Sequence, residues 1–378
     1  MENIPLDQLK TFYEAISNFS QPKELFGDLG SLPAQQLQQL EISFKALIKL
    51  YHPDHYARQP SELYYVTEIT KFINIFRQQA LEKIKSGTYE DENASDYKGV
   101  IQTSQHDYFV TSLLVEGSLT DIYRGYYLDT GDTVQHRKEV ILKIIADPSK
   151  NALMDQEAAF YQTLTHFCFP SYVESFRTPQ GKKAIVLSYI ANGYDLIELL
   201  KLYRQQYQVP GLPQEHLFWI LDRFLSALGL LHENHILHGN IQLDNLMVQP
   251  QTHNGLLIDF LHCRIQPAPD DVFTVVNPAY CAPEVLTRHF KPHPVSDIYA
   301  LGRCMIELLG GTAGRLDDAI VVHPALRLLL QKMTLPDPAK RADDAWALTG
   351  ELKKLRQQLY GVKPNFIPLT IGGCNGRR

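Results

Sequence analysis

Cysteine is scarce in this chain, and the few cysteines have neither disulfide nor metal-site spacing. The 378 residues include five cysteines, an odd number, and none lies in a C-x-x-C motif. Disulfide frameworks and cysteine zinc sites rest on even-numbered or closely spaced cysteines. We therefore exclude both kinds of structure and expect a reducing compartment.

Long apolar runs and an excess of positive charge are absent as well. No run is long enough to span a bilayer, and the N-terminus lacks the basic and apolar segments of a signal peptide. The net charge of −6 gives no field that would attract nucleic acid or an anionic membrane. We expect a cytoplasmic protein with neither nucleic acid nor membrane among its partners.

The chain is long for one domain and changes its pattern at one place. A length of 378 residues favours two or more domains. The stretch 86–106 is polar and lacks periodicity, which is typical of a linker. Helical patterns precede it, and strand patterns followed by helical patterns come after it. We predict an α+β protein with an N-terminal helical extension (1–22), a small helical domain (23–88), a linker (89–106), a domain of strands and helices (107–360) and a tail (361–378).

Two apolar stripes predict an antiparallel helix pair before the linker. Apolar residues recur at three- and four-residue intervals in each helix. The first stripe comprises Leu37, Leu40, Phe44, Leu47 and Tyr51, and the second comprises Ile69, Phe72, Ile73, Phe76 and Ala80. Prolines in the connection YHPDHYARQPSE end the first helix.

The connection carries the tripeptide His52-Pro53-Asp54, and the spacing of Lys45, Lys49 and His52 puts them on one helix face. These residues, flanked by two helices, resemble the J-domain of heat-shock co-chaperones. The resemblance implies that the cationic face and the turn dock on a DnaK-type chaperone. One alternative is a solvated face beside an ordinary turn. Another is a helix pair that only braces the rest of the chain.

The strands after the linker resemble the N-terminal lobe of protein kinases. The stretch 108–128 predicts two strands joined by a tight turn at Gly117, and EVILKIIA predicts a third. A helix with Glu157 follows, as the αC helix follows the V-A-I-K strand in that family. The resemblance implies that Lys143 contacts nucleotide phosphates, that Glu157 is its ion-pair partner, and that Gly117 is the remaining glycine of the loop over the phosphates.

The later part of the chain resembles the C-terminal lobe of the same family, with six motifs in the family order. Besides the catalytic loop, these include Leu187 as gatekeeper, Asp259-Phe260-Leu261 in place of D-F-G, Ala282-Pro283-Glu284 matching A-P-E, Asp297, and Arg341 as the partner of the A-P-E glutamate. The resemblance implies a bilobal protein-kinase-like fold over 107–360, with a β-rich N-lobe and a mainly helical C-lobe.

The stretch LHGNIQLDNLMV resembles the catalytic loop H-R-D-x-x-x-x-N. His238 and Asn245 match the family, whereas Asn240 replaces the catalytic aspartate and Gln242 replaces the usual lysine. An amide has no basic oxygen that could take the proton of a hydroxyl nucleophile. The resemblance therefore implies magnesium ligands at Asn245 and Asp259 but lost phosphoryl transfer, which defines a pseudokinase.

Three histidines near this loop could be taken for a metal cluster. His232, His235 and His238 follow each other at intervals of three, which spreads them around a helix and the turn after it. No acidic or cysteine ligand converges with them in the sequence pattern. We predict no metal site at these histidines.

These patterns predict a non-catalytic adaptor and co-chaperone. Its J-domain recruits a DnaK-type chaperone and stimulates ATP hydrolysis by that chaperone. Its pseudokinase domain, with a weakened site for ATP and Mg²⁺, binds a client or regulator that the sequence does not name. The alternative is a weakly active or atypical ATP-dependent protein kinase or transferase, because a fold does not by itself fix a function.

Overall fold

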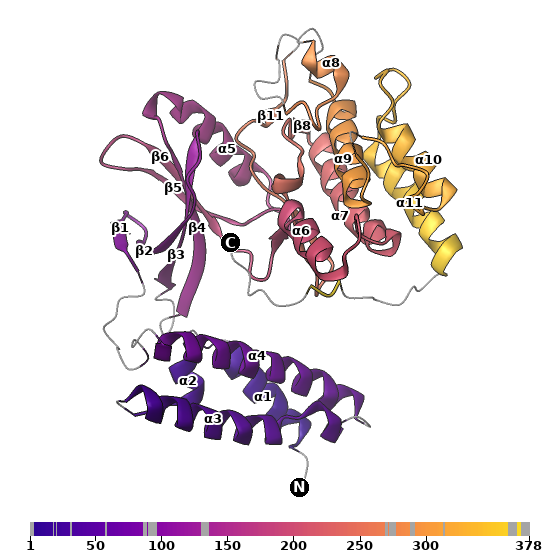
Figure 1. Cartoon of the computed structure of the whole chain (residues 1–378). Helices are drawn as coiled ribbons and strands as arrows, with labels where there is room; N and C mark the ends of the chain where they lie inside the picture. Colours follow the sequence, from indigo (N-terminus) through magenta and orange to yellow (C-terminus); the bar gives the residue numbers. More distant parts are fainter. Residues whose placement is uncertain are drawn as a thin grey trace. The chain divides into compact units, whose positions relative to one another are not determined.

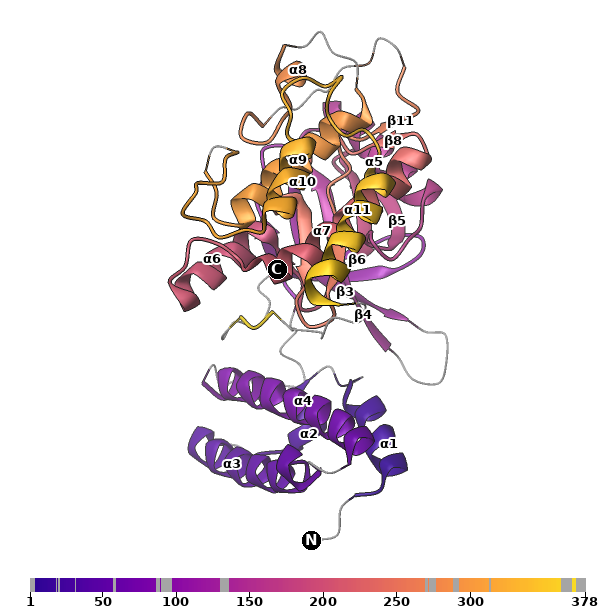
Figure 2. The same cartoon turned by 90° about the vertical axis from the view of Figure 1, so that its right-hand side faces the viewer.

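The computed structural model divides the chain into two compact units (Figures 1 and 2). Each unit has its own hydrophobic core. Unit 1 is Met1–Lys98 and unit 2 is Gly99–Arg378. The structure describes residues 4–17, 19, 21–30, 32–56, 59–85, 89, 97–129, 136–268, 271, 277–287, 292–312, 314–361 and 369–371.

Helices build the described part of unit 1. In chain order they are α1 (Leu6–Ser17), α2 (Pro22–Phe26), α3 (Pro33–Leu50), the 3-10 helix η1 (Pro53–Tyr56) and α4 (Pro60–Lys85). Proline starts α2, α3 and α4, at a position where its missing N–H costs no helical hydrogen bond. As the apolar stripes predict, α3 and α4 are antiparallel. Glu41 pairs with Arg77, whereas Tyr51 accepts a hydrogen bond from Thr70, which comes earlier in α4.

One residue of the predicted stripe on α3 lies on the wrong side of the helix. Leu40 and Tyr51 are buried, but Leu37 is 39% exposed. Gln36 is buried instead, and its Nε2 donates a hydrogen bond to the Gly30 carbonyl at 2.7 Å. The buried stripe therefore begins at a polar residue, because this amide satisfies the backbone of the loop before the helix. Apolar periodicity alone does not reveal that.

Unit 2 begins with a six-stranded antiparallel sheet in the order β1-β2-β3-β4-β6-β5. Its strands are β1 (Gly99–Gln102), β2 (Asp107–Val115), β3 (Thr120–Asp129), β4 (His136–Ile145), β5 (Tyr172–Arg177) and β6 (Lys183–Ser188). The one-turn helix η2 (Pro148–Lys150) leads into α5 (Asn151–Thr163), which packs on β5 and β6. β2 and β3 meet at Gly117, where a Cβ would lie 2.4 Å from the Thr120 carbonyl oxygen. Glycine permits this close approach of the backbone.

The sequence predicts a linker over 89–106, but β1 lies inside that segment. Its first residue, Gly99, pairs with Val110 of β2. The connecting turn is closed by Thr103, whose N–H and hydroxyl each donate to the His106 carbonyl at 3.0 Å. A four-residue strand is too short to show period-two alternation, so sequence pattern gives it no signal. Unit 2 therefore starts earlier than the predicted domain.

Mainly helices form the rest of unit 2. The elements are β7 (Tyr194–Asp195), α6 (Leu196–Tyr207), α7 (Gln214–Glu233), β8 (Ile236–Leu237), η3 (Leu243–Asn245), β9 (Leu246–Gln249), β10 (Asn254–Leu257), β11 (Arg264–Ile265), α8 (Pro283–Leu286), α9 (Pro294–Leu308), α10 (Pro324–Met333) and α11 (Ala345–Tyr360). The predicted α+β class, with a strand-rich part before a helical part, is confirmed. Within the described part of the chain, no helix combines the length and the apolar character needed to cross a bilayer.

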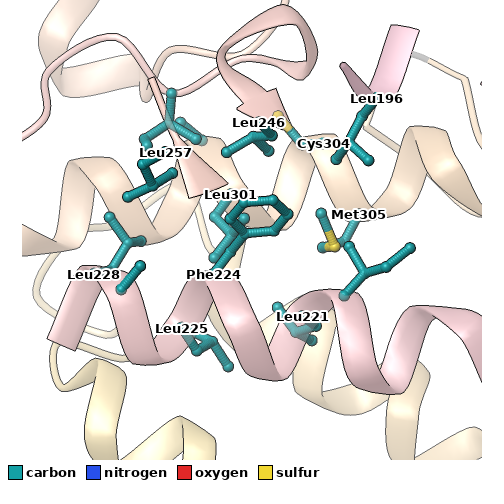
Figure 3. Packing of buried hydrophobic residues seen from close by; sticks show 14 of the residues in the cluster. Leu196, Leu221, Phe224, Leu225, Leu228, Leu246, Leu257, Leu301, Cys304 and Met305 are labelled. Atoms are coloured by element: carbon teal, nitrogen blue, oxygen red, sulfur yellow. The ribbon is translucent and has the colours of Figure 1, made fainter. Parts of the chain in front are cut away.

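The core of this helical part forms where α7, α9 and the β9–β10 hairpin meet (Figure 3). Phe224 and Leu228 of α7, Leu257 of β10 and Leu301 of α9 are fully buried there. The hairpin leads directly from this core to Asp259. The packing therefore fixes the backbone on both sides of the candidate site.

Candidate functional site

A cavity of about 630 Å³ lies in unit 2 between the sheet and the loops at the ends of β8 and β10. The turn at Gly117, strands β4 and β6, and helix α5 form one side of it. Leu187 on β6 lines it, at the predicted gatekeeper position. Asn240, Asn245 and Asp259 line the opposite side. The fold thus brings together residues that are more than a hundred positions apart.

Lys143 on β4 forms ion pairs with carboxylates from two other elements. Its Nζ lies 2.8 and 3.0 Å from the two oxygens of Glu157 on α5, and 2.5 Å from Oδ1 of Asp259. Burial by itself would lower the pKa of Lys143, but Asp259 and Glu157 outweigh it and raise that pKa. Burial by itself would raise the pKa of Asp259, but Lys143 outweighs it and lowers that pKa. Lys143 is therefore a fixed cation beside an ionised carboxylate.

Phe260 fixes the backbone next to Asp259. Asp259 has a φ of 63°, in the left-handed region that aspartate tolerates better than most residues. The N–H of Phe260 donates to Oε1 of Glu157 at 3.0 Å, and its ring stacks on Phe160 with centroids 3.7 Å apart. Leu261, at the predicted position of the family glycine, is buried. These contacts hold the Asp259 carboxylate towards Lys143.

One buried carboxylate holds the loop before η3. Asp297 on α9 accepts hydrogen bonds from the backbone N–H groups of His238 and Gly239, each at 2.9 Å. Its Oδ2 also lies 3.2 Å from Nε2 of His232. Burial by itself would raise the pKa of Asp297, but the hydrogen bond and charge of His232 outweigh it and lower that pKa. Asp297 is therefore an ionised anchor for this loop.

Two of the three histidines that could be taken for a metal cluster have side-chain partners of their own. His232 pairs with Asp297, and Nε2 of His238 lies 3.1 Å from the Ile258 carbonyl oxygen. His235 has a φ of 57° in the turn after α7. Among the described residues, no group of three or more histidine, cysteine and carboxylate side chains has a geometry that could hold a metal ion.

Asn240 lies in the cavity and uses its amide as a donor. Its Nδ2 donates to Oδ2 of Asp259 at 3.2 Å. Its backbone carbonyl accepts a hydrogen bond from Nδ2 of Asn245 at 2.8 Å. A carboxylate at position 240 could not donate to Asp259, and an amide cannot take up a proton at neutral pH. The arrangement can bind and orient charged groups, but Asn240 cannot be a general base.

The family of this arrangement follows from comparison with known proteins. A family model described as "Protein kinase domain" matches residues 108–314, more than half of the chain. The chain belongs to the protein kinase family. Unit 2 therefore contains the kinase domain, with the sheet as N-lobe and the helical part as C-lobe.

Individual kinases are similar over parts of their length. Serine/threonine-protein kinase pkn3 of Myxococcus xanthus is 24% identical over 298 residues, which cover 70% of this chain and 52% of the relative. The membrane-associated tyrosine- and threonine-specific cdc2-inhibitory kinase of Drosophila melanogaster is 30% identical over 203 residues, 49% of this chain and 38% of the relative. CBL-interacting serine/threonine-protein kinase 16 of Arabidopsis thaliana is 25% identical over 268 residues, which cover 62% of this chain and 54% of the relative. The chain thus spans about half, or less, of the length of these relatives.

Kinases use ATP and Mg²⁺, and the residues around the cavity fit both. Lys143 offers a cation for phosphate, and Asp259 offers an ionised carboxylate for a divalent metal. Nδ2 of Asn245 is occupied by the Asn240 carbonyl, whereas its Oδ1 accepts no hydrogen bond within the described residues. An amide oxygen beside a carboxylate is a donor set that Mg²⁺ accepts.

Two features of the kinase site escaped sequence reasoning. His262 lines the same cavity and is buried, and this burial lowers its pKa although Asp259 opposes the effect. It follows the D-F-G position directly, so a motif comparison extended by one residue would have found it. The second feature is a hydrogen bond at 2.6 Å from Nδ2 of Asn277 to Oε1 of Gln242. No sequence signal links these two amides.

The predicted partner of the A-P-E glutamate is found in contact with it. Arg341 donates to both oxygens of Glu284, at 2.6 and 2.9 Å, and both side chains are buried. Arg341 also donates to the carbonyl oxygens of Leu335 and Val295. This pair ties the segment after the cavity to the C-terminal helices of the kinase domain.

The predicted docking residues of unit 1 lie at the end of α3 and in the turn after it. Lys45 and Lys49 are exposed on α3. Pro53 starts η1, and the side chain of Asp54 is 88% exposed. The N–H of Asp54 donates to Nδ1 of His52 at 3.3 Å. These residues therefore occupy one region of the surface of unit 1.

Proposed function

We propose that the kinase domain binds Mg²⁺ and ATP in its cavity. The observation that carries this proposal is Lys143, an ammonium group held by Glu157 and Asp259 inside the cavity. Lys143 would neutralise phosphate oxygens, and Asp259 with Asn245 would hold the metal. When bound, Mg²⁺ neutralises charge on the phosphates. The short loop at Gly117 would cover the phosphates with a single glycine, so we expect weaker binding than in kinases with three.

Thermal melting in the presence of Mg²⁺ and ATP tests the proposal. A ligand at 100 times its dissociation constant stabilises the folded state by about 2.7 kcal/mol, which raises the melting temperature measurably. Lys143→Met should abolish that rise. Lys138→Met is the matched control, because Lys138 lies on the same strand but is exposed and outside the cavity. An unchanged melting temperature of the wild-type protein at millimolar ATP would reject nucleotide binding.

We also propose that phosphoryl transfer by the catalytic-loop route is lost or slow. A general base contributes typically about 10²- to 10⁴-fold to the rate, and Asn240 cannot act as one. Gln242 is engaged by Asn277 and carries no charge that could stabilise a phosphate. Radiolabelled transfer to a generic acceptor protein should stay near background. Rapid transfer that disappears in Asp259→Ala would contradict this part of the proposal.

The alternative is a weakly active ATP-dependent transferase, and two observations favour it. The similar proteins are named as kinases. In addition, His262 presents a buried imidazole to the same cavity, and a neutral imidazole accepts a proton. If transfer occurs, His262→Ala should reduce it while the ATP-dependent rise in melting temperature persists. Transfer unaffected by this substitution would exclude His262 as the base of such a reaction.

For unit 1 we propose a co-chaperone role, in which the end of α3 and the turn at His52 dock a DnaK-type chaperone. The support is the exposure of Lys45, Lys49 and Asp54 beside a turn that two buried tyrosines flank. A cationic face suits an acidic partner surface and speeds association. With a kinase domain that binds a client or regulator, the whole chain would act as an adaptor.

Chaperone ATPase measurements test this role. Single-turnover ATP hydrolysis by a DnaK-type chaperone should be faster with the full chain than without it. His52→Gln, Lys45→Glu and Lys49→Glu should each reduce the effect, since they alter the turn or reverse the face. Their circular dichroism should stay unchanged, because these side chains lie outside the core of unit 1. No stimulation by the wild-type chain would leave these helices with a structural role only.

A further inference from the structure

The turn that carries His52, Pro53 and Asp54 is held between two buried tyrosines. Tyr51 caps the end of α3 and is 9% exposed, and Tyr56 ends η1 and is 1% exposed. Within the turn, the His55 N–H donates to the His52 carbonyl at 3.1 Å, and the Asp54 N–H donates to Nδ1 of His52 at 3.3 Å. A single 3-10 turn has poor hydrogen-bond geometry and little stability of its own. The two tyrosines therefore fix the position of the turn on the surface of unit 1.

Helix α1 contacts Tyr51, and Ile4, two residues before the helix, contacts Tyr56. The ring of Phe12 stacks on Tyr51, with centroids 4.8 Å apart and planes 10° from parallel. The backbone N–H of Ile4 donates to the Tyr56 hydroxyl at 3.0 Å. Leu9 and Ile16 are fully buried and fix α1 to the core of unit 1. The N-terminal segment thus contacts the residues that bound the turn on either side.

We propose that α1 is a brace for the turn at His52, with Phe12 as its positioning residue. The sequence offers only a helical extension over 1–22, without a role. The contacts give it one, because loss of the Phe12 ring removes the stacking partner of the Tyr51 side chain and should make the start of the turn more mobile. Thr70 of α4 also donates to the Tyr51 carbonyl, at 2.6 Å, so the backbone has a second anchor that does not need α1. The consequence for docking rests on the proposed co-chaperone role, whereas the brace itself does not.

The neighbouring residue of the same helix provides a matched control. Tyr13 packs against Tyr65 and Phe72 of α4, with centroids 5.6 and 6.2 Å apart, and neither residue belongs to the turn. Tyr13→Leu therefore removes an aromatic contact of α1 without touching Tyr51 or Tyr56. Phe12→Leu removes the aromatic contact between α1 and Tyr51. Phe12→Tyr keeps the ring and serves as the rescue variant.

Hydrogen exchange of the full chain, read over peptides that cover residues 47–56, tests the brace without any partner. An aromatic pair contributes enough that its loss should speed exchange of the Tyr51 and His55 amides by roughly 2- to 12-fold. Phe12→Leu should show this increase, whereas Tyr13→Leu and Phe12→Tyr should exchange as the wild type does. Equal exchange in the two leucine variants would overturn the proposal, whether both were faster or neither.

Chaperone ATPase stimulation by the same variants then tests the consequence for docking. Phe12→Leu should stimulate less than Tyr13→Leu at equal concentration. If Phe12→Leu stimulates as the wild type does, the brace has no part in docking and that part of the inference is overturned. If the wild type itself does not stimulate, the co-chaperone role fails, and the exchange measurement still decides whether α1 braces the turn.

Discussion

Asn240 differs from the aspartate of the family by an amide nitrogen in place of a carboxylate oxygen, and this decides which chemistry the cavity can support. The amide donates to Asp259 and cannot take up a proton at neutral pH. Asn240→Asp should therefore raise phosphoryl transfer, by up to the roughly 10²- to 10⁴-fold that a general base contributes. Initial rates with radiolabelled ATP measure the effect.

Asn240→Ala is the control for that gain, because it removes the bond to Asp259 without supplying a base. It should transfer no faster than the wild type. A rise in both variants would mean that the amide suppresses turnover by holding Asp259. No rise in Asn240→Asp would mean that the short loop at Gly117 or the uncharged Gln242 is enough to prevent transfer.

A second prediction at the scale of one residue concerns Asp297. This carboxylate should make the free energy of unfolding depend on pH. Its pKa is lowered in the folded state, so its contribution is present above its unfolded pKa of about 3.9 and is lost as the pH falls through the folded value. Asp297→Asn should thus unfold more easily than the wild type at pH 7, and the difference should narrow only below about pH 4. Denaturant titrations between pH 7 and 3 measure it. A difference that already narrows between pH 7 and 5 would contradict a lowered pKa of Asp297.

At the scale of elements, the buried pair of Arg341 and Glu284 joins α8 to the segment before α11. Removing one partner of a buried ion pair leaves an uncompensated charge and costs about 3–5 kcal/mol. Arg341→Met should lower the free energy of unfolding of the kinase domain by that amount. Lys332→Met, which breaks an exposed pair with Glu351, should cost at most about 1 kcal/mol. Equal costs for the two variants would mean that the buried pair adds no more than a surface pair.

The helices and strands also show which parts of the fold could be predicted from the sequence and which could not. Strands β2, β3 and β4 and helix α5 carry clear patterns, and motif order was enough to bring Lys143, Glu157 and Asp259 together. Strand β1 is only four residues long and has no pattern of its own. Its place is set by pairing with β2, which is tertiary information. The prediction that Leu37 is buried was wrong for a related reason. The buried position is taken by Gln36, whose side-chain amide bonds to the Gly30 carbonyl, and apolar periodicity does not reveal that contact.

The candidate site divides in the same way between local and tertiary information. The identity of Asn240 is visible in the sequence, but its bond to Asp259 requires the folded cavity. The amide pair of Gln242 and Asn277 joins segments 35 residues apart without any motif. The stack of Phe12 on Tyr51 likewise depends on how α1 lies on the helix pair. Contacts between distant segments that no motif marks were thus the part that the sequence could not supply.

At the scale of the whole molecule, the two units have separate cores, and this predicts two melting transitions. Ile73 is fully buried in the core of unit 1 and Leu228 in that of the kinase domain. A leucine or isoleucine replaced by alanine in a core costs about 2–5 kcal/mol. Ile73→Ala should lower only one transition in calorimetry, and Leu228→Ala only the other. Mg²⁺ and ATP should raise the transition that Leu228→Ala lowers and leave the other unchanged, because the cavity lies wholly in the kinase domain. A single transition that both substitutions lower would show that the two cores unfold as one cooperative structure.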